Sequence, residues 1–160
     1  MAGTPIWNIE GVALSTPVAG SLGYLVQASC AHLGALLGVY PTLAAGVSVA
    51  SANTDWVLGT VTEVVPANTV TNKFHIQGIN IESCDRDAVF ELVLYQGAGD
   101  AEVARVRFAI LGGFSGAIVN VTTTVEIPAN ARIRAALASS NGTALVATVA
   151  LSVRYAEVLV

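Results

Sequence analysis

Titratable side chains are where chemistry would begin, and this chain has few of them. Its 160 residues include two histidines, His32 and His75, with 11 acidic and seven basic residues. Neither histidine has an acidic residue at the spacing of a metal-binding motif, and no nucleophile elbow occurs. His75 falls inside a predicted strand, on the opposite side from Phe74 and Ile76. A core or interface histidine is therefore the preferred interpretation of both.

Two groups of carboxylate side chains are further candidates for a functional site, one for Ca²⁺ binding and one for glycoside hydrolysis. Three acidic residues surround Arg86 between Glu82 and Asp87, and loop carboxylates of this kind bind Ca²⁺ in other proteins. Their spacing is not that of an EF-hand, so we prefer a solvated loop that pairs internally with Arg86. Glu91 and Glu102 flank a predicted turn and, facing each other across it, would resemble the carboxylate pair of a glycosidase, but no aromatic sugar platform lies beside them.

The remaining motifs indicate structure rather than chemistry. The glycine-rich stretches at 97–100 and 112–116 lack the lysine of a phosphate-binding loop, so both are predicted turns. The pair Asn141-Gly142 favours a type I′ turn and predicts a hairpin between the last two strands. Cys30 and Cys84 form no C-x-x-C motif; one disulfide between them is conceivable, but two small buried residues are preferred. The sequence predicts no catalytic residue, no metal site, no cofactor and no enzymatic activity.

Composition points to a protein that packs against other chains. The chain is 54% hydrophobic and 11% charged, against about 25% charged in an average soluble domain. This balance excludes intrinsic disorder, and the net charge of −4 disfavours nucleic acid as a partner. No Asp, Glu, Lys or Arg occurs between Glu10 and Asp55. The window 31–50 is long enough to span a membrane, but Pro41 and the missing basic anchors disfavour that. We expect a soluble protein made in the cytoplasm.

From Trp56 onward the hydrophobic pattern has a period of two, which is typical of strands with one buried face. Predicted strands cover residues 56–65, 74–81, 90–94, 104–110, 119–127, 133–137 and 144–158. Turn residues separate them, so the sequence predicts an all-β fold, an antiparallel β-sandwich resembling a jelly roll, over residues 56–160. A change of phase at Gly78 predicts a β-bulge.

Residues 1–55 are predicted to form an extended apolar arm. Gly46–Ala50 is expected to join the sandwich as a strand, and a short helix within 22–39 is an alternative that Gly34 and Gly38 weaken. Elsewhere, Val65-Pro66-Ala67-Asn68 and Ile127-Pro128-Ala129-Asn130 repeat the same pattern. A duplicated half-sandwich or two similar strand-to-turn corners would explain it, and the second explanation requires less.

Two segments of the second half resemble small virion structural proteins of tailed bacteriophages. One is F-E-L-V-L-Y-Q-G-A-G-D-A-E at Phe90–Glu102, and the other is V-E-I-P-A-N-A-R-I-R-A-A-L at Val125–Leu137, before a closing T-V-A-L-S-V from Thr148. Those proteins usually carry glycine where Asn130 stands here, and both residues tolerate the left-handed conformation. The resemblance covers roughly residues 56–156. It implies a β-sandwich on a phage particle, as a capsid decoration (cement) protein, and supplies no catalytic residues.

A protein of that kind would bind across major capsid protein subunits and add buried area at their seams. The expected partners are the major capsid protein and copies of this chain, as a trimer or dimer, without nucleic acid or membrane. Its expected location is the capsid surface. The alternative is a glycan- or receptor-binding sandwich of a phage fibre or baseplate. The uncharged arm is expected to supply the partner contacts through its large apolar side chains: Trp7, Leu22, Tyr24, Leu25, Leu33, Leu36, Leu37 and Tyr40.

Overall fold

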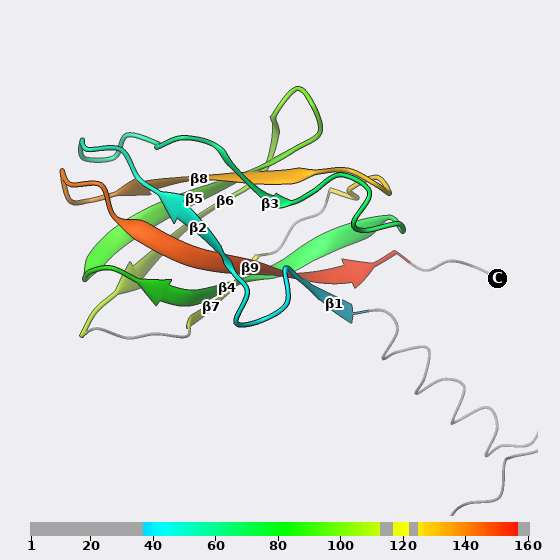
Figure 1. Ribbon diagram of the computed structural model, residues 1–160, viewed down its shortest axis with the longest axis horizontal. Coiled ribbons are helices and arrows are strands. Elements are labelled where there is room, and N and C mark those ends of the chain that lie inside the picture. The colour runs from blue at the N-terminus through cyan, green and yellow to red at the C-terminus, as the bar shows by residue number, and fades with distance from the viewer. Residues whose placement is uncertain (1–36, 113–116, 122–124, 157–160) are drawn as a thin grey trace, which may run out of the picture. The chain divides into compact units, whose positions relative to one another are not determined.

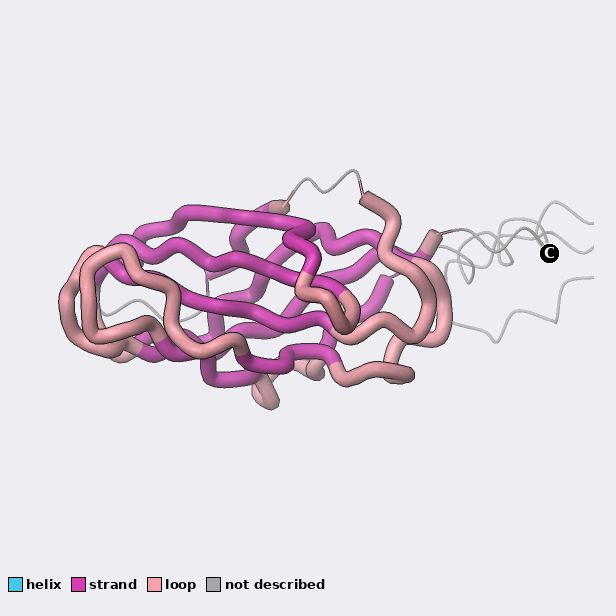
Figure 2. The backbone as a smooth tube through the Cα atoms, turned by 90° about the horizontal axis from the view of Figure 1, so that it is seen from above, coloured by secondary structure: helices cyan, strands magenta, loops and turns pink. Residues whose placement is uncertain are grey.

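The computed structural model describes residues 37–112, 117–121 and 125–156. These ranges contain β1 (Leu37–Tyr40), β2 (Val47–Ala50), β3 (Thr62–Val65), β4 (Phe74–Cys84), β5 (Ala88–Gln96), β6 (Ala101–Ile110), β7 (Ala117–Asn120), β8 (Ile133–Ser139) and β9 (Val146–Tyr155). They form two antiparallel sheets that lie one above the other (Figure 1). Strands connected by loops make up the described chain (Figure 2), which confirms the predicted all-β sandwich.

The two sheets have simple orders of neighbouring strands. Sheet A runs β1-β9-β4-β7, and β2 also pairs with β9 beyond the end of β1. Sheet B runs β3-β8-β5-β6. Because antiparallel sheets can be packed on one face and solvated on the other, period-two sequences suit both layers. In the described part of the chain, no helix is long and apolar enough to cross a membrane.

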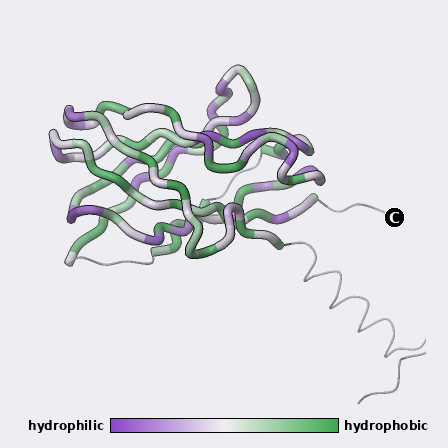
Figure 3. Tube along the Cα trace, viewed as in Figure 1, coloured by the Kyte–Doolittle hydropathy of each residue, from purple (hydrophilic) through white to green (hydrophobic). Residues whose placement is uncertain are grey.

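The core lies between the sheets, where the alternating apolar residues meet. Phe90, Leu92 and Leu94 of β5 are fully buried, as are the alternate residues of β9 facing them from the other layer. Hydrophobic colour follows the strands, and hydrophilic colour gathers at the turns (Figure 3). The bulge predicted at Gly78 is present, because the register against β9 shifts between Ile76 and Gly78. The shift keeps apolar residues on both sides of Gly78 in the core.

The sandwich begins at Leu37, ahead of the boundary expected at Trp56. The strand predicted at Gly46–Ala50 is confirmed as β2, and β1 precedes it in the region where a helix was an alternative. Both strands pair with β9, and Val49 is fully buried in the core. β1 has only four residues, which is too short a run of alternation to distinguish a strand from the alternative helix.

Residues 56–61 depart from the predicted strand. β3 begins only at Thr62, and Trp56 takes a left-handed conformation with φ of 59°. The Trp56 N–H donates to Ser139 O and the Gly59 N–H to Leu137 O, both at 2.8 Å, so the segment follows β8 irregularly. A Cβ on Gly59 would lie 2.1 Å from the Ala50 carbonyl oxygen. This close approach of two backbones interrupts the regular strand.

The hairpin predicted at Asn141-Gly142 is wrong. β8 belongs to sheet B and β9 to sheet A, so residues 140–145 cross between layers instead of joining neighbouring strands. Positive φ values occur elsewhere, but neither Asn141 nor Gly142 has one, so the turn is not type I′. The Asn141 side chain instead accepts hydrogen bonds from the N–H and hydroxyl of Thr143, at 3.3 and 3.1 Å. An Asx-type turn has replaced the backbone turn.

The two corners that repeat in the sequence adopt the same turn. Asn68 and Asn130 are both left-handed, with φ of 65° and 63°. They also lie side by side, because the Asn68 N–H donates to Asn130 O at 3.1 Å and the Asn130 N–H donates to Val70 O at 2.7 Å. Asparagine accepts this conformation at little cost, which is the corner chemistry predicted from the sequence.

Candidate functional site

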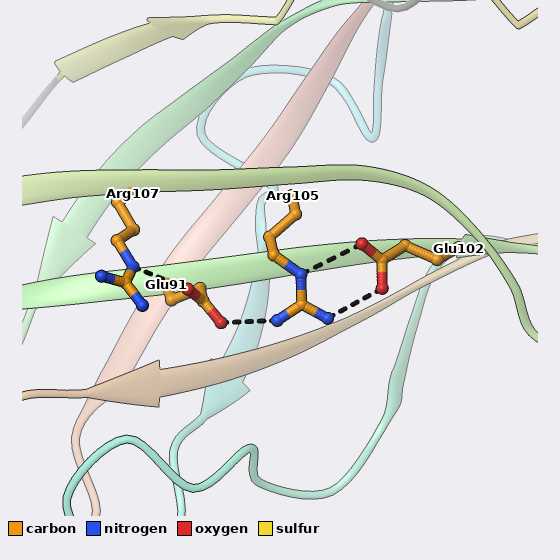
Figure 4. A network of polar contacts seen from close by, with 4 residues as sticks. All are labelled: Glu91, Glu102, Arg105 and Arg107. Carbon is orange, nitrogen blue, oxygen red and sulfur yellow. Dashed lines mark hydrogen bonds and ion pairs between the residues drawn. The ribbon is translucent and has the colours of Figure 1, made fainter.

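Four charged side chains form a network on the outer face of sheet B (Figure 4). Arg105 and Arg107 alternate with core residues along β6, so both point outward, and Glu91 of β5 lies directly across from Arg107. Glu91 receives Arg105 Nη1 at 2.6 Å on one oxygen and Arg107 Nε at 2.7 Å on the other. Glu102 binds Arg105 through both of its oxygens, at 3.0 and 2.8 Å.

The network brings Glu91 and Glu102 together, as the sequence suggested, but it does so through Arg105. The hydrogen bond from Arg107 is the main cause that lowers the pKa of Glu91, with Arg105 adding to it. The hydrogen bond from Arg105 likewise lowers the pKa of Glu102. A glycosidase acid requires a carboxyl group whose pKa is raised, so that it is protonated near neutral pH. This pair has the opposite electrostatics and acts as a strand-to-strand clamp.

Trp56 and Arg107 stack on the same face. The Arg107 guanidinium carbon lies 4.7 Å from the Trp56 ring centroid, within the range of a cation–π interaction. The Trp56 side chain still has 44% of its surface exposed. Val93 of β5 and Ala136 of β8 are paired on the same outer face of sheet B, yet both are almost fully buried. The charged side chains therefore lie over apolar residues. Alternation predicts the outward arginines, whereas no sequence signal places Trp56 beside Arg107.

A second group of arginines holds the turn between β5 and β6. Gly97 and Asp100 take positive φ values of 68° and 52° in this turn. The Arg132 side chain donates to Gly97 O at 3.1 Å, and the Gly97 N–H donates back to Arg132 O at 3.1 Å. Arg134 forms an ion pair with the Asp100 carboxylate. The two segments that resemble phage structural proteins therefore interlock in space.

The acidic residues around Arg86 act as separate loop anchors. Each carboxylate accepts hydrogen bonds from the backbone of a different segment: Ala44 and Gly46 donate to Glu82, Val146 to Asp85 and Gly112 to Asp87, at 2.9, 3.2, 2.9 and 2.6 Å. Among the described residues, no group of three or more His, Cys, Asp or Glu side chains is placed to hold a metal ion. The three carboxylates thus bind separate backbone segments instead of converging on one site for Ca²⁺.

His75 and Cys84, the other titratable candidates in the described residues, also have structural surroundings that account for them. His75 faces away from the buried Phe74 and Ile76 and lies 3.2 Å from Val125 O through Nδ1. Cys84 is a free, half-buried thiol, and burial followed by the charge of Asp85 raises its pKa to about 11. His32 and Cys30 lie outside the described residues.

The predicted partner-binding residues divide into two sets. Leu37, at the start of β1, is 60% exposed. Tyr40 packs against the core, and its hydroxyl lies 2.5 Å from that of Tyr155, whose pKa rises to about 12 because of burial and this hydrogen bond. The remaining six lie outside the described residues: Trp7, Leu22, Tyr24, Leu25, Leu33 and Leu36.

No family model and no curated protein matches this chain. A solved structure, "Structure of infectious bursal disease virus Gx strain", is similar at 15% identity and a TM-score of 0.38, over 74% of this chain and 32% of that chain. This chain therefore spans about a third of that viral chain. A likeness at this TM-score carries no argument about function.

Proposed function

We propose that this chain is a non-enzymatic virion structural protein that decorates a phage capsid and stabilises it by binding across major capsid protein subunits. The observation that carries this proposal is the set of large apolar side chains that the described sandwich leaves exposed. Eight large hydrophobic residues are between 38% and 71% exposed: Leu37, Leu43, Trp56, Val57, Val89, Leu111, Ile118 and Val125. Covering these side chains with another chain would remove apolar surface from water, which favours association.

The distribution of charge supports the same proposal. The strands of sheet B contain six charged residues, whereas those of sheet A contain only Glu82 and Arg154. In one row across sheet A, Ile118 is 68% exposed, whereas its neighbours Asn80 and Ala150 are buried and uncharged. A neutral face enters an interface without the cost of desolvating ions. Sheet A is thus the better candidate for the face that meets another chain.

The phage assignment rests on the resemblance of the segments at Phe90–Glu102 and Val125–Leu137. Their interlocking through Arg132 and Gly97 supports reading them as one structural unit rather than two chance matches. In this proposal the arm and the exposed residues near it contact the capsid, and copies of the chain associate around a capsid symmetry axis. The protein is made in the host cytoplasm and ends on the capsid surface.

Counting copies in purified particles tests the proposal. A decoration protein should be present in a fixed ratio to the major capsid protein, on the scale of the whole shell, as measured by quantitative gel. Capsids stripped of this protein should rebind the full chain, and should bind a chain lacking residues 1–36 more weakly. A few copies per particle, or recovery with isolated tails, would contradict the proposal.

Trp56 favours a second candidate, a glycan- or receptor-binding module of a fibre or baseplate. An exposed indole supported from one side by Arg107 has the form of a stacking platform. Titrating host-surface glycans while following tryptophan fluorescence tests this candidate, with Trp56→Ala as the matched variant. Saturable quenching that Trp56→Ala abolishes would favour it over capsid decoration.

A further inference from the structure

Residues 140–145 connect the two sheets and hold Asn141 and Gly142 in an unusual arrangement for an Asn-Gly pair. We propose that Asn141 is a modification site, at which the backbone nitrogen of Gly142 attacks the side-chain carboxamide and the asparagine is deamidated. The proposal concerns the described sandwich alone and is independent of the proposed function. It rests on contacts made by Asn141, Thr143 and Asp55.

The first contacts involve the carboxamide oxygen of Asn141. The Thr143 N–H donates to Oδ1 at 3.3 Å and the Thr143 hydroxyl donates to it at 3.1 Å. The first of these bonds closes a ring that contains both Cγ of Asn141 and the nitrogen of Gly142, so the side chain is held in one orientation relative to that nitrogen. When the nitrogen attacks, negative charge develops on Oδ1. Two donors aimed at that atom stabilise the charge as an oxyanion hole does.

The second feature is Gly142 itself. Glycine has no side chain to block its nitrogen, and Gly142 is exposed to water. Within the described ranges its N–H donates to no acceptor, so no hydrogen bond must be broken before attack. The Asp55 carboxylate lies against Gly142, because a Cβ added there would come within 3.0 Å of Asp55 Oδ1. Among the described residues no hydrogen bond joins the Gly142 N–H to this carboxylate, so in the proposed step the amide proton reaches Asp55 through one water molecule as the nitrogen attacks.

The surrounding segment keeps these groups in place. Ser51 and Asn53 precede Asp55 at alternate positions, and each accepts a hydrogen bond from the connection: Leu145 N–H donates to Ser51 Oγ at 3.0 Å and Ala144 N–H to Asn53 Oδ1 at 2.9 Å. On the other side, the buried Ser139 donates to Asn141 O at 2.8 Å. A connection anchored at both ends holds the reacting groups in one geometry and lowers the entropic cost of the reaction.

The step balances with water as the only co-reactant. A bond forms between the Gly142 nitrogen and Asn141 Cγ, and the bond from Cγ to the side-chain nitrogen breaks. The amide proton passes through Asp55 to the leaving nitrogen, which departs as ammonia and leaves a cyclic succinimide. Water then opens the ring at either carbonyl, giving aspartate or isoaspartate at position 141. The product carries a new negative charge next to Gly142 in the chain, and Asp55 already lies against that glycine.

The test follows the full-length protein during incubation at neutral and mildly alkaline pH. Peptide mass spectrometry should show the replacement of NH₂ by OH at Asn141, with released ammonia in equal amount, while Asn130 in the same digest stays unchanged. Thr143→Val removes the hydroxyl donor and keeps the N–H; it should slow conversion by about tenfold or more. Thr143→Ser should restore the parental rate, and Asp55→Asn should slow conversion while circular dichroism confirms that each variant is folded.

A synthetic peptide covering residues 136–147 separates the effect of the fold from that of the Asn-Gly sequence. The folded protein should convert faster than this peptide, and Thr143→Val should slow the protein much more than the peptide. The proposal is overturned if Asn141 stays intact while the peptide converts. Equal rates in the peptide and the protein, or rates in the folded variants that match the parent, would overturn it as well.

Discussion

Glu91 is the residue on which the outer face of sheet B depends. Its side chain is only 12% exposed, yet it remains ionised because Arg105 and Arg107 bind one oxygen each. Exposed ion pairs alone contribute little to stability, typically about 0–1 kcal/mol. Glu91 should contribute more to stability than an exposed ion pair, because it is mostly buried and binds two arginines, and charge-assisted hydrogen bonds contribute about 1.5–3 kcal/mol.

We predict that Glu91→Gln lowers the unfolding free energy by about 1–2 kcal/mol near neutral pH. The arginines lower the pKa of Glu91 in the folded protein. Its contribution is therefore complete above the unfolded-state pKa, about 4.3, and is lost as the pH falls through the lower folded-state pKa. Urea unfolding near neutral pH and at about pH 3 should show the variant and the parent converging in acid. Glu63→Gln, at an exposed carboxylate of β3, is the control and should change stability little at either pH.

Asn130 tests whether the left-handed corner matters. Its φ of 63° is costly for any residue with a branched Cβ, whereas glycine takes it freely. We predict that Asn130→Val destabilises the protein by about 1–3 kcal/mol and that Asn130→Gly leaves its stability nearly unchanged. Thermal melting of both variants checks this. Equal melting temperatures would mean that the corner relaxes out of the left-handed region.

At the scale of elements, the strands that the sequence predicted well are those whose period-two pattern is long. β5, β6, β8 and β9 are each seven residues long or longer, and a buried face of that length is enough to fix their register. The connections were harder to predict. The local preference of Asn141-Gly142 for a hairpin is overridden because β8 and β9 lie in different sheets, and turn type follows from which strands are joined.

In the candidate site too, the sequence predicted the side chains on regular strands but not those on irregular segments. Alternation placed Arg105 and Arg107 on the outer face of a strand, and the sequence placed Glu91 and Glu102 on either side of one turn. The contact between Trp56 and Arg107 was not, because it depends on a left-handed residue and on a segment that leaves the strand geometry before β3. Side chains joined through irregular backbone leave no periodic signal.

Gly59 shows how closely that irregular segment packs. Its Cα faces the backbone of Ala50, and a methyl group would lie 2.1 Å from the Ala50 carbonyl oxygen. We predict that Gly59→Ala costs about 2–4 kcal/mol, because the backbones of β2 and the segment before β3 must separate. Gly99→Ala is the matched control, since nothing lies within 4 Å of a Cβ at that position. Denaturant unfolding of both variants checks the difference, and similar midpoints would contradict it.

At the scale of the whole molecule, the two sheets differ in charge, and this difference indicates different roles for sheet A and sheet B. Sheet B pairs the charges of Glu91, Glu102, Arg105 and Arg107 with one another. Sheet A carries few charges, and its edge strands β1 and β7 expose Leu37 and Ile118 at 60% and 68%. Because sheet edges with little charge are open to pairing with another chain, the decoration role that we propose would use sheet A for contact with copies of this chain or with capsid subunits.

Two truncations test where the folding unit ends and where association begins. Deleting residues 1–36 keeps β1 and β2, so we predict a cooperative all-β unfolding transition near that of the parent. Deleting residues 1–50 removes both strands from the edge of β9 and takes Val49 from the core. Burial of one valine contributes about 1.5–3 kcal/mol, and the backbone pairs with β9 are lost as well. The longer deletion should therefore be unfolded or much less stable.

Association should respond to the shorter deletion, because residues 11–36 are apolar and carry no charge. We predict that the full chain is oligomeric at micromolar concentration and that the chain lacking residues 1–36 is folded but shifted toward monomer. Light scattering measures the mass of each form, and circular dichroism during heating measures stability. Leu37→Ser in the full chain separates the arm from the edge of β1 as the source of association. If the full chain is monomeric, the prediction of self-association is wrong. If the deletion leaves the number of chains per oligomer unchanged, the contact surface lies on the sandwich and not on residues 1–36.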